Sequence, residues 1–133
     1  MTYEEREQDV PACIRDDSLW RMEAYLLGLF LADLAWHDVT KLGQDHRTRS
    51  LADQLYRAAG NVSSNVAGLL ARHGQDRARF YEYTLGSTRE ARDWYYKACH
   101  VLDKKVAKHQ TDLCTQIIRL TITMAARERR TNR

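Results

Sequence analysis

Residues 54–72 read QLYRAAGNVSSNVAGLLAR and combine a regular apolar pattern with many small side chains. The apolar residues recur every three or four positions, which is the spacing of one face of an α-helix. They are Leu55, Ala59, Val62, Val66 and Leu69. Between them, Gly60 and Gly68 each lower helix propensity by up to roughly 1 kcal/mol relative to alanine. The stretch therefore predicts a helix whose short side chains let the backbone of a neighbouring helix approach closely.

The same helical period appears in three other segments of the 133-residue chain. Asp17 or Ser18 can cap the first helix, Gln75 or Asp76 can cap the third, and Gly43 and Gly74 follow the first and second. The predicted helices run from about residue 18 to 42, from about 47–50 to 73, from about 76 to 102 and, after a break within 103–112, to about 126. Four such helices with short connections predict an all-α, antiparallel up-down-up-down four-helix bundle.

The predicted domain organisation has three parts. Residues 1–17 form an acidic, weakly ordered N-terminal arm, residues 18–126 form the bundle, and residues 127–133 form a basic C-terminal tail. The arm holds six acidic and two basic side chains and the only proline, Pro11, although the whole chain carries a net charge of +3. The remainder of the chain is therefore basic, which permits contact with a polyanion.

Composition and hydropathy favour a soluble cytoplasmic protein. Apolar residues make up 44% of the chain and charged residues 29%, as in soluble globular proteins. The longest apolar run, at 24–36, is interrupted by Asp33 and is shorter than the roughly 20 residues that a membrane-spanning helix needs. Cys13, Cys99 and Cys114 form no CxxC pair and follow no secretory signal, so we expect reduced thiols in the cytoplasm.

A set of residues in the second and third helices stands at a characteristic spacing: Gln54, Leu55, Arg57, Ala58, Ala59, Asn65, Ala67, Arg72, Phe80, Gly86, Ser87 and Glu90. This spacing resembles the signature of a bacterial four-helix bundle family, the 23S rRNA intervening sequence proteins. The resemblance covers about 50 residues and includes one helix-helix connection. Thr40 also fits the pattern, and Ser63 departs from it by replacing the usual proline.

This resemblance implies an antiparallel four-helix bundle assembled as a homopentameric ring or barrel. It also implies kinship with the accessory proteins of diversity-generating retroelements, which are similar pentameric bundles that bind nucleic acid and a reverse transcriptase. No catalytic residues are established for the family, so the resemblance implies none here. Asn65 is a polar residue among small ones, and we expect its amide to bond the backbone of an adjacent helix or subunit.

Motifs for metal binding, nucleophilic catalysis and phosphate cradling do not match the sequence. A di-iron bundle needs inward Glu residues with Glu-x-x-His pairs, and none occurs. Cys99 and His100 are neighbours on a helix and point about 100° apart, so they do not form a dyad. Gly60 and Gly68 follow no strand and precede no lysine, which excludes a P-loop. We therefore predict no metal, no cofactor and no enzymatic activity.

Arginines are the residues most indicative of function. In an up-down bundle the C-terminal end returns to the connection between the second and third helices, so arginines from both places share one end. We call this set the basic pole: Arg72, Arg77, Arg79, Arg127, Arg129 and Arg130. Arg133 belongs to the same tail. The alternative is that these side chains merely solvate a helical surface.

The first functional hypothesis is a non-enzymatic, homo-oligomeric bundle that binds RNA or DNA through phosphate contacts at the basic pole, without reading base sequence. The second is a protein-interaction scaffold that docks a partner such as a reverse transcriptase. A third, a small metalloenzyme, would require bound metal after purification.

Overall fold

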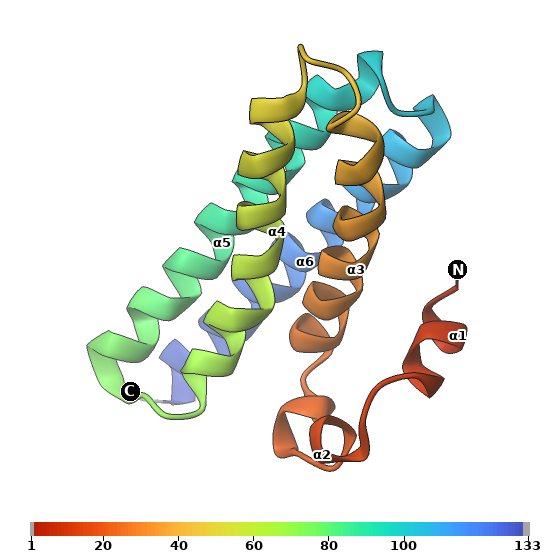
Figure 1. Ribbon diagram of the computed structural model, residues 1–133. Coiled ribbons are helices and arrows are strands. Elements are labelled where there is room, and N and C mark those ends of the chain that lie inside the picture. Colours follow the sequence, from red (N-terminus) through yellow and green to blue (C-terminus); the bar gives the residue numbers. More distant parts are fainter. Residues whose placement is uncertain (1, 132–133) are drawn as a thin grey trace.

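The structure is a computed structural model that describes residues 2–131. Four long helices dominate this part of the chain, and no strand occurs in it (Figure 1). They are α3 (Glu23–Leu42), α4 (Arg49–Leu69), α5 (Gly74–Lys97) and α6 (Lys104–Thr131), and successive helices run in opposite directions. Shorter elements are α1 (Tyr3–Gln8), α2 (Ala12–Arg15) and the 3-10 turns η1 (Ser18–Arg21) and η2 (Ala98–His100). The prediction of an all-helical fold is confirmed.

The long helices pack in sequence order, with α4 against α3 and α5, and α6 against α5 more than against α3. The main core is formed by fully buried side chains of all four helices, among them Leu31, Leu55, Tyr95 and Ile117. A second, smaller cluster lies toward the end where α4 meets α5 and contains Ala24, Val66, Leu69, Tyr81 and Ala125. Both clusters follow from the three-and-four spacing of apolar residues along each helix.

Small residues bring α4 close to both of its neighbours at defined points. A Cβ added to Gly28 of α3 would lie 3.1 Å from the backbone nitrogen of Ser63 on α4. A Cβ added to Gly68 would lie 2.6 Å from the ring of Phe80 on α5. By contrast, a Cβ at Gly60 would meet nothing within 4 Å. The predicted close approach of helix backbones is therefore confirmed between Gly28 and Ser63, whereas Gly68 makes room for the Phe80 side chain and Gly60 faces open space.

Two glycine substitutions are expected to have opposite effects on stability. Gly60→Ala adds helix propensity without a clash and should raise the free energy of unfolding by up to about 1 kcal/mol. Gly28→Ala forces a methyl group against the backbone of α4 and should lower it by about 1–2 kcal/mol. Urea unfolding followed by circular dichroism measures both changes. Equal shifts for the two variants would contradict this account of α3–α4 packing.

Two helices begin at other residues than predicted, and in each case an aspartate side chain accepts a hydrogen bond from a nearby backbone amide. The Asp17 carboxylate accepts a hydrogen bond from the Leu19 amide at 2.9 Å and caps η1, so α3 begins at Glu23 instead of residue 18. Asp103 accepts from the Lys105 amide at 2.8 Å, and α6 begins at Lys104. The break between the third and fourth helices therefore precedes most of the segment 103–112.

Both terminal segments are more helical than predicted. Residues 127–131, predicted to belong to the basic C-terminal tail after the bundle, continue α6 to Thr131, and Arg133 lies outside the described residues. The N-terminal arm forms α1 and α2 instead of a weakly ordered chain. Arg6, 8% exposed, forms an ion pair with Asp33 of α3, and the Tyr3 and Phe30 rings meet edge to face at 5.7 Å. These long-range contacts hold α1 of the arm against α3.

Candidate nucleic-acid interface

The end of α6 lies beside the start of α5, where the basic pole was predicted (Figure 1). Arg77 of α5 forms an ion pair with Glu128 of α6, which joins the two helix ends. Gly74 is the one described glycine with a left-handed backbone, at φ +56°, and the chain reverses there between α4 and α5. The structure thus brings the connection after α4 together with the last turns of α6.

The arginines of the basic pole differ in what holds them. The Arg72 guanidinium lies 4.2 Å from the centre of the Phe80 ring, in a cation–π contact. Arg79 is exposed and pairs with Asp76 of its own helix at 3.2 Å. On α6, Arg127, Arg129 and Arg130 are all exposed. Arg129 and Arg130 have no ion-pair partner within residues 2–131, so both cations face solvent.

Arg77 has a structural position inside the basic pole. Its side chain is 24% exposed, and besides Glu128 it donates a hydrogen bond to the carbonyl oxygen of Leu69, in the last turn of α4. The last carbonyls of a helix have no partner within the helix, so this bond satisfies one of them. Arg77 therefore links three helices, and its guanidinium is less available to a ligand than those of Arg129 and Arg130.

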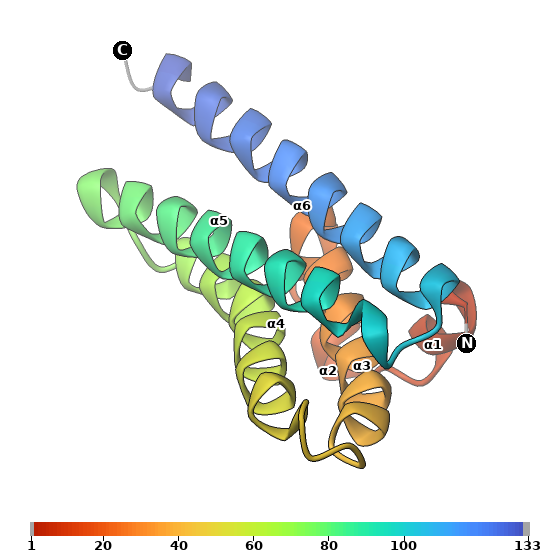
Figure 2. The same cartoon turned by 90° about the horizontal axis from the view of Figure 1, so that it is seen from above.

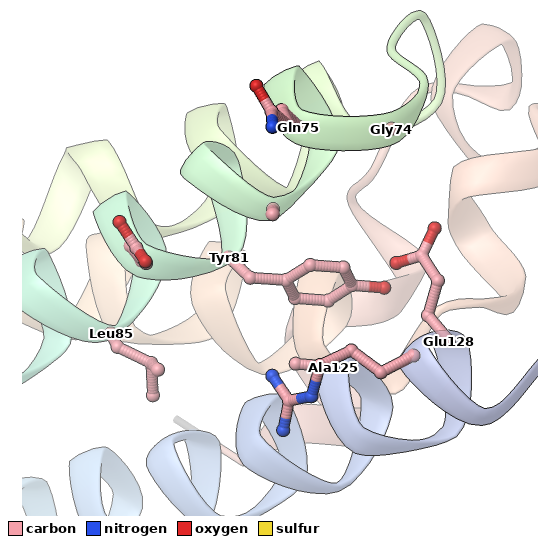
Figure 3. A pocket seen from close by; sticks show the side chains of 9 residues that line it. Gly74, Gln75, Tyr81, Leu85, Ala125 and Glu128 are labelled. Atoms are coloured by element: carbon pink, nitrogen blue, oxygen red, sulfur yellow. The ribbon is translucent and has the colours of Figure 1, made fainter. Parts of the chain in front are cut away.

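A cleft of about 390 Å³ opens between the first turns of α5 and the last turns of α6 (Figure 3). Figure 2 shows that the ribbons of α5 and α6 diverge toward the C-terminal end of α6, and the residues that line the cleft belong to this end. Its apolar lining comes from Ala78, Leu85 and Ala125, and Tyr81 points across it toward Glu128. The polar lining residues are Gln75, Glu82, Glu128 and Arg129. Burial, reinforced by the hydrogen bond to Glu128, raises the pKa of the Tyr81 hydroxyl.

The comparison with protein families identifies the chain. The model of the family described as 23S rRNA-intervening sequence protein matches residues 22–126. The chain belongs to this family. The match begins next to the first residue of α3 and ends at residue 126 within α6, so it contains α3, α4, α5 and most of α6 and leaves out α1, α2 and η1. Searches of the curated proteins and of the solved structures each found no match.

Residues that carry the resemblance to the 23S rRNA-intervening sequence proteins divide into packed and exposed positions. Ala58 and Ala59 are buried in the core. Gln54, Ala67, Phe80 and Ser87 are half-buried, whereas Arg57, Gly86 and Glu90 are exposed. The Asn65 amide donates to the Ser87 hydroxyl at 3.4 Å, across α4 and α5. Asn65 therefore bonds an adjacent helix as expected, but to a side chain and not to the backbone.

A hydrogen-bond network among three helices of this family member lies outside the predicted site. The Asp38 carboxylate accepts hydrogen bonds from the Tyr95 hydroxyl at 2.7 Å and from the Gln110 amide at 2.9 Å. This network joins α3, α5 and α6. Sequence reasoning missed it because Asp38 lies 57 and 72 residues from its partners, and no local motif connects them.

Other kinds of site find little support in the described part of the chain. Residues 2–131 contain no group of three His, Cys, Asp or Glu side chains that could hold a metal ion. Burial raises the pKa of the Cys114 thiol to about 12, which keeps it protonated near neutral pH. None of the described helices combines the length and the apolar character needed to cross a bilayer.

Proposed function

We propose that this member of the 23S rRNA-intervening sequence protein family is a non-enzymatic, oligomeric four-helix bundle that binds RNA or DNA through the phosphates. The observation that carries the proposal is the pair of solvent-facing arginines, Arg129 and Arg130, in the last turns of α6. Exposed Arg79 lies on the adjoining helix, and half-buried Arg72 lies on the connection before it. Arginines that contact phosphates release counterions, so binding should weaken steeply as salt concentration rises.

Charge reversal tests the proposed phosphate contacts. The double variant Arg129→Glu/Arg130→Glu should weaken binding on the order of tenfold for each arginine that is reversed, at about 50 mM salt. The negative slope of log affinity against log salt concentration should also become shallower, by about one for each of these arginines. Fluorescence anisotropy with labelled RNA and DNA measures both quantities. The matched control is Lys104→Glu/Lys105→Glu, which makes the same charge change at the other end of α6.

Two outcomes would contradict the proposal. If the control variant weakens binding as much as the reversal at Arg129 and Arg130, the basic pole is not the interface. If the wild-type protein binds neither RNA nor DNA at about 50 mM salt, phosphate binding is wrong and the scaffold hypothesis, with a protein partner such as a reverse transcriptase, takes its place.

We further propose that the bundle assembles with copies of itself, as a homopentamer. An aromatic pair on the α3–α4 surface supports this, because Trp36 is 60% exposed and Tyr56 is 41% exposed, with ring centroids 5.8 Å apart. Exposed aromatic surface of this kind is typical of interaction sites. In a pentameric ring the arginines of the basic pole would be repeated five times. Such a ring of positive charge favours a polyanionic ligand.

Light scattering tests assembly directly. The wild-type mass should be about five times the 15.5 kDa of one chain, and Trp36→Ala should lower it. Tyr96→Ala is the control, since Tyr96 is also exposed but lies on α5. A wild-type mass of 15.5 kDa would exclude the assembly, and an unchanged mass for Trp36→Ala would exclude this surface as its interface.

A further inference from the structure

The cleft between α5 and α6 is lined by apolar side chains and carboxylates, which phosphate binding by the arginines does not require. A phosphate needs cationic or N–H donors, yet the polar residues that line the cleft include the carboxylates Glu82 and Glu128. Carboxylates repel a phosphate at close range. Arg129 lies at the same cleft with an exposed side chain. The cleft and the cations around it are therefore suited to different parts of one ligand.

The interior of the cleft fits a flat group with apolar faces and polar edges. Methyl and isobutyl groups of Ala78, Leu85 and Ala125 line it together with the Tyr81 ring (Figure 3). Its volume of about 390 Å³ lies in the range of roughly 300–1,000 Å³ that is usual for small-ligand sites. The acceptors of Glu82, Glu128 and Gln75 can bond N–H groups at the edge of such a ligand.

One wall of the cleft is held in place before any ligand enters. Glu128 is fixed by the ion pair with Arg77, and the Tyr81 side chain points toward the same carboxylate (Figure 3). Arg77 is in turn anchored to the Leu69 carbonyl. A wall whose side chains are already ordered loses little conformational entropy on binding, which favours affinity for a ligand of matching shape.

We propose that the cleft receives an unpaired nucleobase of the strand whose phosphates contact the basic pole. This inference rests on the proposed function and adds a base contact to it. The base lies against the apolar lining, and its phosphate contacts Arg129, the cationic residue that lines the same cleft. A base in a duplex cannot enter without unpairing, so the cleft makes the protein favour single strands over duplexes. Base–aromatic stacking typically strengthens binding by one to two orders of magnitude per base.

The lining acceptors also select among bases. Cytosine, adenine and guanine carry an exocyclic amino group that can donate to a carboxylate, as cytosine does to Glu or Asp side chains in protein–DNA complexes. Uracil has carbonyl oxygens at C2 and C4 and, at its pairing edge, only the N3–H between them as a donor, so a carboxylate that accepts from N3–H also lies close to two acceptor oxygens. We therefore expect oligocytidylate to bind more tightly than oligouridylate of equal length.

A variant that fills the cleft without changing charge tests this proposal. Ala78 is exposed, so Ala78→Phe places a ring in the cleft without removing a buried contact. We expect it to weaken binding of single-stranded oligocytidylate about tenfold, to leave the salt slope unchanged, and to leave binding of an RNA duplex of equal length unchanged. Thr123→Phe, at an exposed position of α6 outside the cleft, is the control. Circular dichroism confirms that both variants are folded.

The outcomes separate this inference from the proposed function. If the wild type binds nucleic acid but Ala78→Phe has no effect, or weakens single strands and duplexes equally, the base contact is wrong and phosphate binding stands. Equal affinity for oligocytidylate and oligouridylate would overturn the selection by Glu82. Absence of any binding by the wild type would overturn the proposed function, and the base contact with it.

Discussion

Alanine in place of Asp38 is expected to lower the free energy of unfolding by roughly 2–6 kcal/mol. The Asp38 carboxylate accepts hydrogen bonds from Tyr95, whose side chain is fully buried, and from Gln110, which is also buried. Removal of the acceptor leaves two buried donors without a partner, and each costs about 1–3 kcal/mol. Urea unfolding followed by circular dichroism measures the loss.

Two further variants sharpen the Asp38 prediction. Tyr95→Phe removes a donor but leaves Asp38 bonded to Gln110, so it should cost only about 1 kcal/mol. Asp53→Ala makes the same substitution at an exposed position of α4, and it should change the free energy of unfolding by less than about 0.5 kcal/mol. A loss for Asp38→Ala no greater than for Asp53→Ala would show that the network does not stabilise the fold.

The second large effect is expected at alkaline pH. Burial raises the pKa of Cys114 from 9.0 to about 12, and burial together with Asp38 raises the pKa of Tyr95 well above its usual value of 10.0. The unfolded chain therefore releases these protons at lower pH than the folded protein does. The stability that these two protonated groups contribute is fully present below about pH 9, and it is lost as the pH rises further. For Cys114 alone the loss should reach about 3 kcal/mol by about pH 11.

Cys114→Ala isolates the contribution of the thiol. Because this variant has no thiol to ionise, its free energy of unfolding should fall less steeply between about pH 9 and about pH 11 than that of the wild type. The measurement is urea unfolding at a series of pH values, with the difference between the two proteins plotted against pH. Parallel curves for the two proteins would mean that Cys114 does not stay protonated in the folded core.

Much of the fold could be predicted from local patterns. The apolar period of residues 54–72 predicts α4, because side chains three and four apart share one face of a helix. Its small residues predict close approach of a neighbouring backbone, and Ser63 against Gly28 confirms this. The family was also identified from spacing within two helices, and the family match to residues 22–126 confirms it. Each of these features depends on residues within about one helix pair.

Features that depend on distant residues could not be predicted in this way. The N-terminal arm is acidic and short, and its first helix, α1, is held by Arg6 against Asp33 and by Tyr3 against Phe30. Thr2 and Glu5 do form a capping box at the start of α1, which is a local signal that the sequence interpretation overlooked. That signal alone predicts a helix turn, whereas the contacts with α3 decide where the turn lies.

The candidate site shows the same division. Helix order alone indicated that arginines after α4 and in the last turns of α6 share one end, because antiparallel helices return the chain there. Which of these arginines remain available depended on tertiary contacts. Arg77 meets Glu128 and the Leu69 carbonyl, while Arg129 and Arg130 face solvent. Sequence determined the helices and their order through periodic side chains, whereas the tertiary structure decided the cleft and the solvent-facing cations, since these depend on contacts between residues far apart in the chain.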